Sequence, residues 1–358
     1  MTGMVMGMEE FAQALEWQAR HAEENGAPAT ARVIRALARV REGDTATGRR
    51  IANWQGLTLK DALPLRIAGG LHHLLLSGRD RRLERVYAGQ VTDQREVDAL
   101  VGELVDTFDT VLLPWLDGPP QTNEAGRSAS ILAGLLWLAQ RSAVRFELLE
   151  LGASAGINTM LDRYFFRLGE TVTGPPGSPM RIEPEWRGAS PPEPPEGFAI
   201  ASVRGCDVAP IDLTDPAAAL RLKAYVWPDA PGRLARVDAA IALASERLPK
   251  VIRMDAADFI AQALAAPRAH GTTRVLFHSI VWQYLPTATQ EAIAARMEGA
   301  ARDASRERPL AWIALETNPA TFAHELTVRL WDGAEHRGEP ALLARAHPHG
   351  AWVEWVAG

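Results

Sequence analysis

The segment GASAG at residues 152–156 could perform two kinds of chemistry. It fits G-x-S-x-G, the sharp turn that exposes a nucleophilic serine in α/β-hydrolases, and Ser154 would then be the nucleophile. Preceded by Glu150, the same residues also fit a strand that ends in an acid and turns through glycines, where backbone can approach a cofactor closely. The two interpretations require different surroundings, so the rest of the chain decides between them.

Acidic residues also close the next two apolar runs, at Asp207 and at Asp255. Because the carboxyl ends of parallel strands share one edge of a sheet, we expect both side chains to lie near Glu150. Carboxylates accept hydrogen bonds from hydroxyl and amino groups, so three of them suit a cofactor with a ribose and an exocyclic amine. Glu170 is closer in sequence to the glycines and is an alternative to Asp207 as the ribose ligand. Asp207 and Asp255 could also serve only as helix N-caps.

The segment before the first strand indicates a second group of site residues. A helix expected from about 125 to 140 runs directly into that strand, so its N-terminus should lie at the same edge of the sheet. Asn123 and Arg127 would then face the ligand crevice, with His347 and His349 opposite them, before the last strand. We predict that these four residues form the catalytic side, where the guanidinium binds an anionic small molecule and a histidine accepts a proton. Helix capping and a histidine-stabilised turn are the alternatives, and no third ligand indicates a metal site.

Apolar periodicity divides the chain into a helical part and an alternating part. The first 145 residues repeat at helical spacing, whereas short apolar runs alternate with helical ones from residue 145 onward. We therefore predict an α/β fold: a doubly wound, mostly parallel, Rossmann-like sheet with an antiparallel edge strand, preceded by an all-helical region. The expected domains are a helical cap at 1–120 and a Rossmann-like domain at 121–358. A Pro- and Gly-rich insertion at 171–197 is expected to form a lid-like loop.

Composition limits the classes of partner. The 358 residues carry a formal net charge of −6, which gives no basic footprint for nucleic acid or an acidic membrane. A single cysteine excludes an intrachain disulfide framework. The first residues contain no basic segment followed by a long apolar core, so we expect a cytoplasmic protein with a small-molecule substrate. The oligomeric state stays open.

On these motifs the second part of the chain resembles the S-adenosylmethionine-dependent methyltransferases with a Rossmann-like core. Glu150, Gly152 and Gly156 match the first motif of that class, and Ala153 and Ser154 lie between the two glycines. Asp207 matches the ribose-binding acid of the class, and Asp255 with Ala256 matches the acidic and small pair beside the adenine. The segment LFHSIVWQYLP, which contains His278, matches the fourth-strand motif. The resemblance implies that these residues bind S-adenosylmethionine.

The whole chain also resembles a bacterial family catalogued as domain of unknown function 2332. Members carry stretches like PQTNEAGRS, ELGASAGINTMLDRY, VWPD and HPHG, which occur here at 120–128, 150–164, 226–229 and 347–350. That resemblance implies a fold and no particular reaction.

The sequence offers three alternatives to methyl transfer. A serine nucleophile normally follows several strands of its own sheet, and everything before residue 146 is predicted to be helical, which disfavours the hydrolase. Nicotinamide is disfavoured because G-x-G-x-x-G would need glycines at Ser154 and Ile157. A non-catalytic, ligand-sensing protein with the same fold is the remaining alternative.

Overall fold

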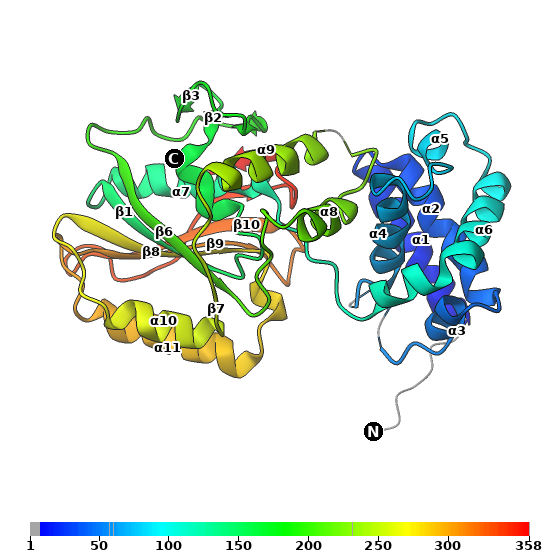
Figure 1. The fold of residues 1–358 in the computed structure, drawn as a ribbon. Helices are drawn as coiled ribbons and strands as arrows, with labels where there is room; N and C mark the ends of the chain where they lie inside the picture. The colour runs from blue at the N-terminus through cyan, green and yellow to red at the C-terminus, as the bar shows by residue number, and fades with distance from the viewer. Residues whose placement is uncertain (1–7, 57, 60, 231, 358) are drawn as a thin grey trace. The chain divides into compact units, whose positions relative to one another are not determined.

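The computed structural model describes residues 8–56, 58–59, 61–230 and 232–357 (Figure 1). The chain divides into two compact units. Unit 1 comprises Met1–Thr122 with Asp215–Val237, and unit 2 comprises Asn123–Thr214 with Asp238–Gly358. A helical unit followed by an α/β unit agrees with the predicted fold class.

Unit 1 is a helical bundle. Its helices are α1 (Met8–Glu24), α2 (Pro28–Glu42), α3 (Ala46–Ala52), α4 (Leu63–Leu76), α5 (Glu84–Tyr87), α6 (Gln94–Leu112), the 3-10 helix η1 (Leu113–Leu116) and α8 (Pro216–Ala224). Val33, Ile34 and Leu37 follow one another at helical spacing in α2 and are fully or almost fully buried in the core of this unit. Burial of such apolar stripes is what stabilises short helices in water.

Asp229, in the second segment of unit 1, caps a helix of the first segment. The Asp229 carboxylate accepts hydrogen bonds from the backbone amides of Ala29 and Thr30, at 2.6 and 3.3 Å. These amides belong to the first turn of α2, which has no capping side chain of its own. An acid at a helix N-terminus satisfies amides that lack intrahelical partners and interacts favourably with the helix dipole.

A nine-stranded sheet forms the centre of unit 2, in the order β5-β12-β11-β10-β9-β8-β1-β6-β7. The strands are β1 (Arg145–Leu151), β5 (Glu185–Arg187), β6 (Ala199–Asp207), β7 (Val251–Arg253), β8 (Thr272–Ser279), β9 (Leu310–Thr317), β10 (His324–Trp331), β11 (Ala341–Ala346) and β12 (Trp352–Trp355). The pairs from β7 to β9 along the sheet are parallel, and those from β9 to β12 are antiparallel.

Helices cover both faces of this sheet (Figure 1). On one face α7 (Ser128–Ala139) packs against β9 and β10. On the other face Leu149 and Leu151 of β1 share an apolar core with Phe259 of α10 (Ala256–Ala265) and Ile293 of α11 (Thr287–Ala301). Because side chains alternate along a strand, Glu150 projects to the α7 face. The remaining helix, α9 (Arg233–Glu246), precedes β7.

The proline-rich insertion at 171–197 contains short strands, whereas the sequence predicts a lid-like loop without them. It forms β3 (Thr171–Thr173) and β4 (Arg181–Ile182), which build a small sheet with β2 (Phe165–Leu168), and it supplies β5 at the edge of the large sheet. Prolines are tolerated here because edge strands and turns leave backbone amides without ladder partners.

The expected antiparallel edge pair needs a second correction. The runs LTVRLWDG (326–333) and AWVEWV (351–356) are too close together for a helical crossover, which predicts that they pair antiparallel with each other. In the structure β11 lies between β10 and β12 and pairs with both. The true edge on this side is β5, which runs parallel to β12. The β11 sequence ALLARA has the apolar spacing of a helix, so its pattern does not predict the strand that it forms.

Candidate functional site

The order of the parallel strands identifies one edge of the sheet. Numbered along the chain, β1, β6, β7, β8 and β9 stand in the order 3-2-1-4-5, that of doubly wound nucleotide-binding sheets. Ligands of such sheets bind outside the carboxyl ends of the strands, where the order reverses, which here is between β1 and β8. The segments that follow these two strands meet there, since a Cβ atom on Gly152 would stand 2.4 Å from Val281 Cγ2.

Three strand ends lie side by side at this edge. The Ala153 amide donates to the Cys206 carbonyl at 2.9 Å, and the Met254 amide donates to the Asp207 carbonyl at 3.1 Å. These bonds join the ends of β1, β6 and β7, so the structure brings Asp207 and Asp255 to the glycine loop. Glu170 lies elsewhere, in the turn between β2 and β3 of the small sheet.

Both acids have structural partners. Asp207 Oδ2 accepts a hydrogen bond from the Ser154 amide and Oδ1 accepts one from the Ala209 amide, each at 2.8 Å. Asp255 is the N-cap of α10 and accepts from the Ala257 amide at 2.8 Å. The capping interpretation is therefore correct for Asp255, and Asp207 holds a loop. Each carboxylate oxygen keeps further lone pairs that could accept from a ligand.

Protein packing accounts for both glycines. Gly152 and Gly156 have φ values of +63° and +72°, in the left-handed region that favours glycine. A Cβ atom on Gly156 would lie 2.6 Å from Pro249 Cβ, and one on Gly152 would lie 2.4 Å from Val281 Cγ2. The close approaches at these glycines are thus made by neighbouring side chains of the protein.

The chain turns back onto the sheet after the glycines without forming an α-helix. It forms the 3-10 helix η3 (Asn158–Arg163), whereas the match to a Rossmann-like glycine turn predicts a regular α-helix here. The Ile157 amide at its start donates to Asn123 Oδ1 at 2.8 Å. Asn123 therefore holds the end of the glycine loop, and the start of the α7 segment lies at the expected edge.

A buried polar cluster occupies the α7 face beside this loop. Glu150 is 2% exposed and Asn158 is 1% exposed. Among the described residues, Glu150 Oε2, Ser154 Oγ and both side-chain polar atoms of Asn158 have no hydrogen-bond partner. Burial raises the pKa of Glu150 to about 8, against the opposite effects of the Asn158 amide and the Arg127 guanidinium. A pKa raised in this way favours the protonated form of Glu150 at neutral pH. Asn158 belongs to the same cluster and is not among the residues predicted from the sequence.

Ser154 has an unusual backbone but no activating base. Its φ of +52° is a conformation that residues other than glycine rarely adopt. A serine nucleophile needs a histidine or another base within hydrogen-bond reach. In the described part of the chain, Ser154 Oγ is buried and contacts no such group.

The predicted catalytic residues lie together instead of across a crevice. Arg127 Nε donates to the Pro348 carbonyl at 2.8 Å, and its Nη1 donates to the Ser279 carbonyl at 3.3 Å. Arg127 thus links the HPHG turn directly to the end of β8. The two histidines of that turn are neighbours, because the His349 amide donates to His347 Nδ1 at 3.1 Å and the ring centroids are 5.4 Å apart.

His278 and Ala256 lie on the other face of the sheet. The His278 ring is 1% exposed, its Nδ1 lies 2.7 Å from Glu316 Oε1, and its Nε2 accepts a hydrogen bond from Trp312 Nε1 at 2.9 Å. The indole donor leaves the ring proton on Nδ1, which donates to Glu316. Ala256 is buried in the α10 core. Neither side chain joins the Glu150 cluster.

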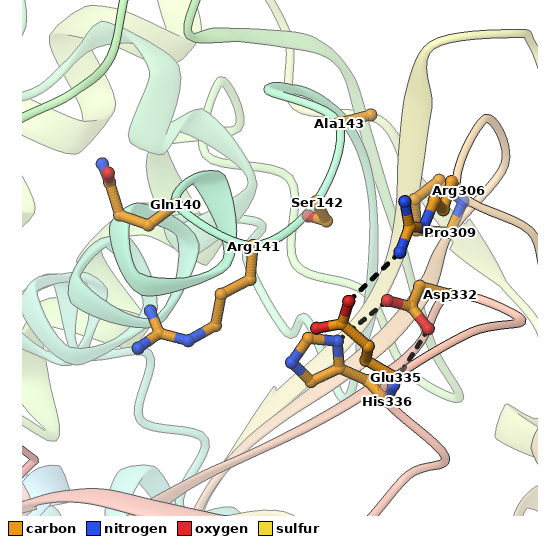
Figure 2. Close-up of a pocket in the computed structure, with 9 residues that line it drawn as sticks. All are labelled: Gln140, Arg141, Ser142, Ala143, Arg306, Pro309, Asp332, Glu335 and His336. Carbon is orange, nitrogen blue, oxygen red and sulfur yellow. Dashed lines mark hydrogen bonds and ion pairs between the residues drawn. The ribbon is translucent and has the colours of Figure 1, made fainter.

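A wide cavity lies away from these residues, at the amino edge of the sheet (Figure 2). It has a volume of about 710 Å³ and is lined by the end of the α7 segment, the start of β9 and the turn after β10. His336 donates to Asp332, and Arg306 pairs with Glu335, as Figure 2 shows. The charged groups of this cavity are largely paired with one another, so fewer of them are available to bind a ligand than at the carboxyl edge.

Two features, a membrane-spanning helix and a metal-binding cluster, are absent from the described residues. None of their helices is both long enough and apolar enough to cross a bilayer. They also contain no group of three or more His, Cys, Asp or Glu side chains placed to hold a metal ion.

Comparison with known proteins gives one family. A family model described as "Uncharacterized protein conserved in bacteria (DUF2332)" matches residues 12–355, which include most of both units. No curated protein and no solved structure matches the chain.

Proposed function

The chain belongs to the DUF2332 family of bacterial proteins, and we propose from the geometry of the carboxyl edge that it binds S-adenosylmethionine. In this proposal it transfers the methyl group to a small molecule. The supporting observation is that Glu150 Oε2 and both side-chain polar atoms of Asn158 are buried without a hydrogen-bond partner among the described residues, as is Ser154 Oγ in the loop between them. A buried polar group without a partner costs about 1 to 3 kcal/mol, so a ligand that supplies partners is favoured.

The chemistry of the cluster suits the amino-acid part of this cofactor. Glu150 and the Asn158 carbonyl oxygen accept hydrogen bonds, which an ammonium group donates. The Ser154 hydroxyl and the Asn158 nitrogen donate them, and a carboxylate accepts. At the neighbouring strand ends, lone pairs of Asp207 and Asp255 are available for the ribose hydroxyls and the adenine amine.

The residues of the edge also support a division of roles. When bound, the cofactor supplies an electrophilic methyl group on a sulfonium centre, and its transfer requires alignment and exclusion of water. Arg127 and Asn123 act as positioning residues, because they hold the HPHG turn and the glycine loop. His347 and His349 are the candidate groups for accepting a proton from the methyl acceptor.

Calorimetric titration with S-adenosylmethionine and with its demethylated product S-adenosylhomocysteine tests the proposal. We expect both to bind, and Asn158→Ala to weaken binding by about ten-fold, the value of one good hydrogen bond. An ammonium group beside Glu150 would ionise it, so binding near pH 7 should release a proton, seen as a heat that depends on the buffer. Glu150→Gln should abolish that release. Glu170→Gln, in the small sheet, is the matched control and should change nothing.

Two results would replace the proposal. If neither compound binds the full chain, or if Asn158→Ala and Glu150→Gln bind like the parent, the cofactor assignment is wrong. The strained φ of Ser154 favours a serine hydrolase as the second candidate, and fluorophosphonate labelling of Ser154 would support it. Binding without turnover of any acceptor would favour the ligand-sensing role.

A further inference from the structure

A second cavity opens on the α11 side of the sheet, on the face opposite the Glu150 cluster. It has a volume of about 310 Å³ and is lined by one residue of α11, one of the 3-10 helix η4 (Trp282–Tyr284), and residues of β8, β9 and β10: Ala294, Trp282, His278, Trp312, Ala314, Glu316, Thr327 and Arg329. Alternation along β9 places Trp312, Ala314 and Glu316 on one face. The volume lies at the lower end of the range for small-molecule sites.

Aromatic rings form the walls of this cavity. The Trp282 and Trp312 ring centroids are 5.4 Å apart with an interplanar angle of 60°, and His278 stacks on Trp282 at 5.0 Å and 18°. The hydrogen bond from Trp312 Nε1 to His278 Nε2 fixes two of the rings relative to each other. A pocket whose walls are already ordered loses little entropy when a ligand enters.

The Glu316 carboxylate is held by one of its two oxygens. Its Oε1 accepts from His278 Nδ1 at 2.7 Å and from the amides of Val281 and Trp282 at 3.1 and 3.2 Å. Glu316 Oε2 makes no hydrogen bond with any described residue, and the side chain is 17% exposed. The cavity therefore offers one fixed acceptor oxygen.

The charge of the cavity argues against a cationic ligand. Indole faces beside a carboxylate attract cations. Here Arg329 already lines the cavity, with its guanidinium 5.7 Å from the Trp312 ring centroid and Nη1 3.5 Å from Glu298 Oε1. A second positive charge would be repelled by it, whereas a neutral flat ring would not.

We propose that this cavity binds a neutral, planar nitrogen heterocycle, which packs against the Trp282 and Trp312 indoles and donates an N–H hydrogen bond to Glu316 Oε2. Stacking on an indole favours flat rings in general. The hydrogen bond selects those with an N–H group. This inference goes beyond methyl transfer and does not rest on it.

Benzimidazole and 1-methylbenzimidazole form a matched pair of probes, because only the first has an N–H donor when neutral. We expect benzimidazole to bind the full chain about ten-fold more tightly in calorimetry at pH 7.5, since a hydrogen bond to a charged acceptor contributes about 1.5 kcal/mol or more. Glu316→Gln should remove that preference. Trp282→Leu should weaken both probes, whereas Trp137→Leu, on α7 at the other face, should weaken neither.

The inference is overturned if neither probe binds, if the parent binds both equally, or if Trp282→Leu and Trp137→Leu behave alike. Tetramethylammonium provides a further arm. Tighter binding of this cation than of benzimidazole would show a cation site in place of a heterocycle site. Circular dichroism of each variant establishes that it is folded, and Trp282→Phe, which keeps an aromatic wall and should keep most of the affinity, replaces Trp282→Leu if that variant is not.

Discussion

Asp207 Oδ2 accepts a hydrogen bond from the Ser154 amide at 2.8 Å, so the end of β6 holds the loop that follows β1. The residue that resembles a ribose ligand is therefore also a structural residue. A loss of ligand affinity in an Asp207 variant could come from either role, and stability and binding must be measured on the same variants.

Asp207→Ala should lower the free energy of unfolding by about 1 to 3 kcal/mol, because the Ser154 and Ala209 amides lose their acceptor. Urea unfolding measures this change. Glu291→Ala, an exposed position on α11, is the control and should stay within about 0.5 kcal/mol of the parent. Equal stability of the two variants would contradict the structural role of Asp207.

Glu150 should make stability depend on pH. The unfolded chain loses this proton near 4.5 and the folded chain near 8, so the folded state binds more protons between these values. The free energy of unfolding therefore falls as pH rises through this window, by up to about 1.4 kcal/mol per pH unit. Urea unfolding from pH 5 to pH 8 should show a shallower decline for Glu150→Gln. Parallel curves would mean that Glu150 ionises normally in the folded protein.

Gly152→Ala should destabilise the fold, because its Cβ atom would meet Val281 Cγ2 at 2.4 Å in a backbone with φ of +63°. Overpacking of this kind costs about 1 to 3 kcal/mol. Val281→Ala should recover part of that loss in the double variant. Thermal unfolding of the parent, both single variants and the double variant measures the coupling. Additive effects would show that the two residues do not touch.

Ser154→Gly should keep or raise stability, because glycine adopts the φ of +52° without strain and the buried hydroxyl is removed. Ser154→Ala retains the strained backbone and is the control. A gain of about 0.5 to 1 kcal/mol for glycine relative to alanine is expected in urea unfolding. A more stable alanine variant would mean that the backbone at this position is relaxed.

The parallel half of the sheet was predictable from the sequence because each strand is a short apolar run that ends in a polar residue. The runs that end at Glu150 and Asp207 form β1 and β6, which are neighbouring parallel strands, so both acids lie at the carboxyl edge as predicted. The strand order, which identifies the switch point between β1 and β8, depends on contacts distant in sequence and could not be read from any single run.

The side chains of the site were less predictable. Asn158 follows the glycines in an unremarkable stretch, and only the 3-10 turn brings it to Glu150. The resemblance of LFHSIVWQYLP to a fourth-strand motif predicts that His278 binds the same cofactor as the glycine loop. The alternation of β8 sends its ring to the opposite face, where Trp312 and Glu316 hold it. The position of a residue along a strand predicts the edge of the sheet at which it lies. Whether it occupies an odd or an even position predicts the face to which its side chain points.

The capping of α2 by Asp229 constrains the order in which the helical unit can fold during synthesis. The helical unit begins at the N-terminus but includes Asp215–Val237, so its last part leaves the ribosome only after β1 and β6 have been synthesised. Until then the Ala29 and Thr30 amides have no carboxylate to bind. The helical unit can therefore be completed only after the first strands of the other unit have been synthesised, and its N-terminal helices lack the Asp229 cap while those strands emerge.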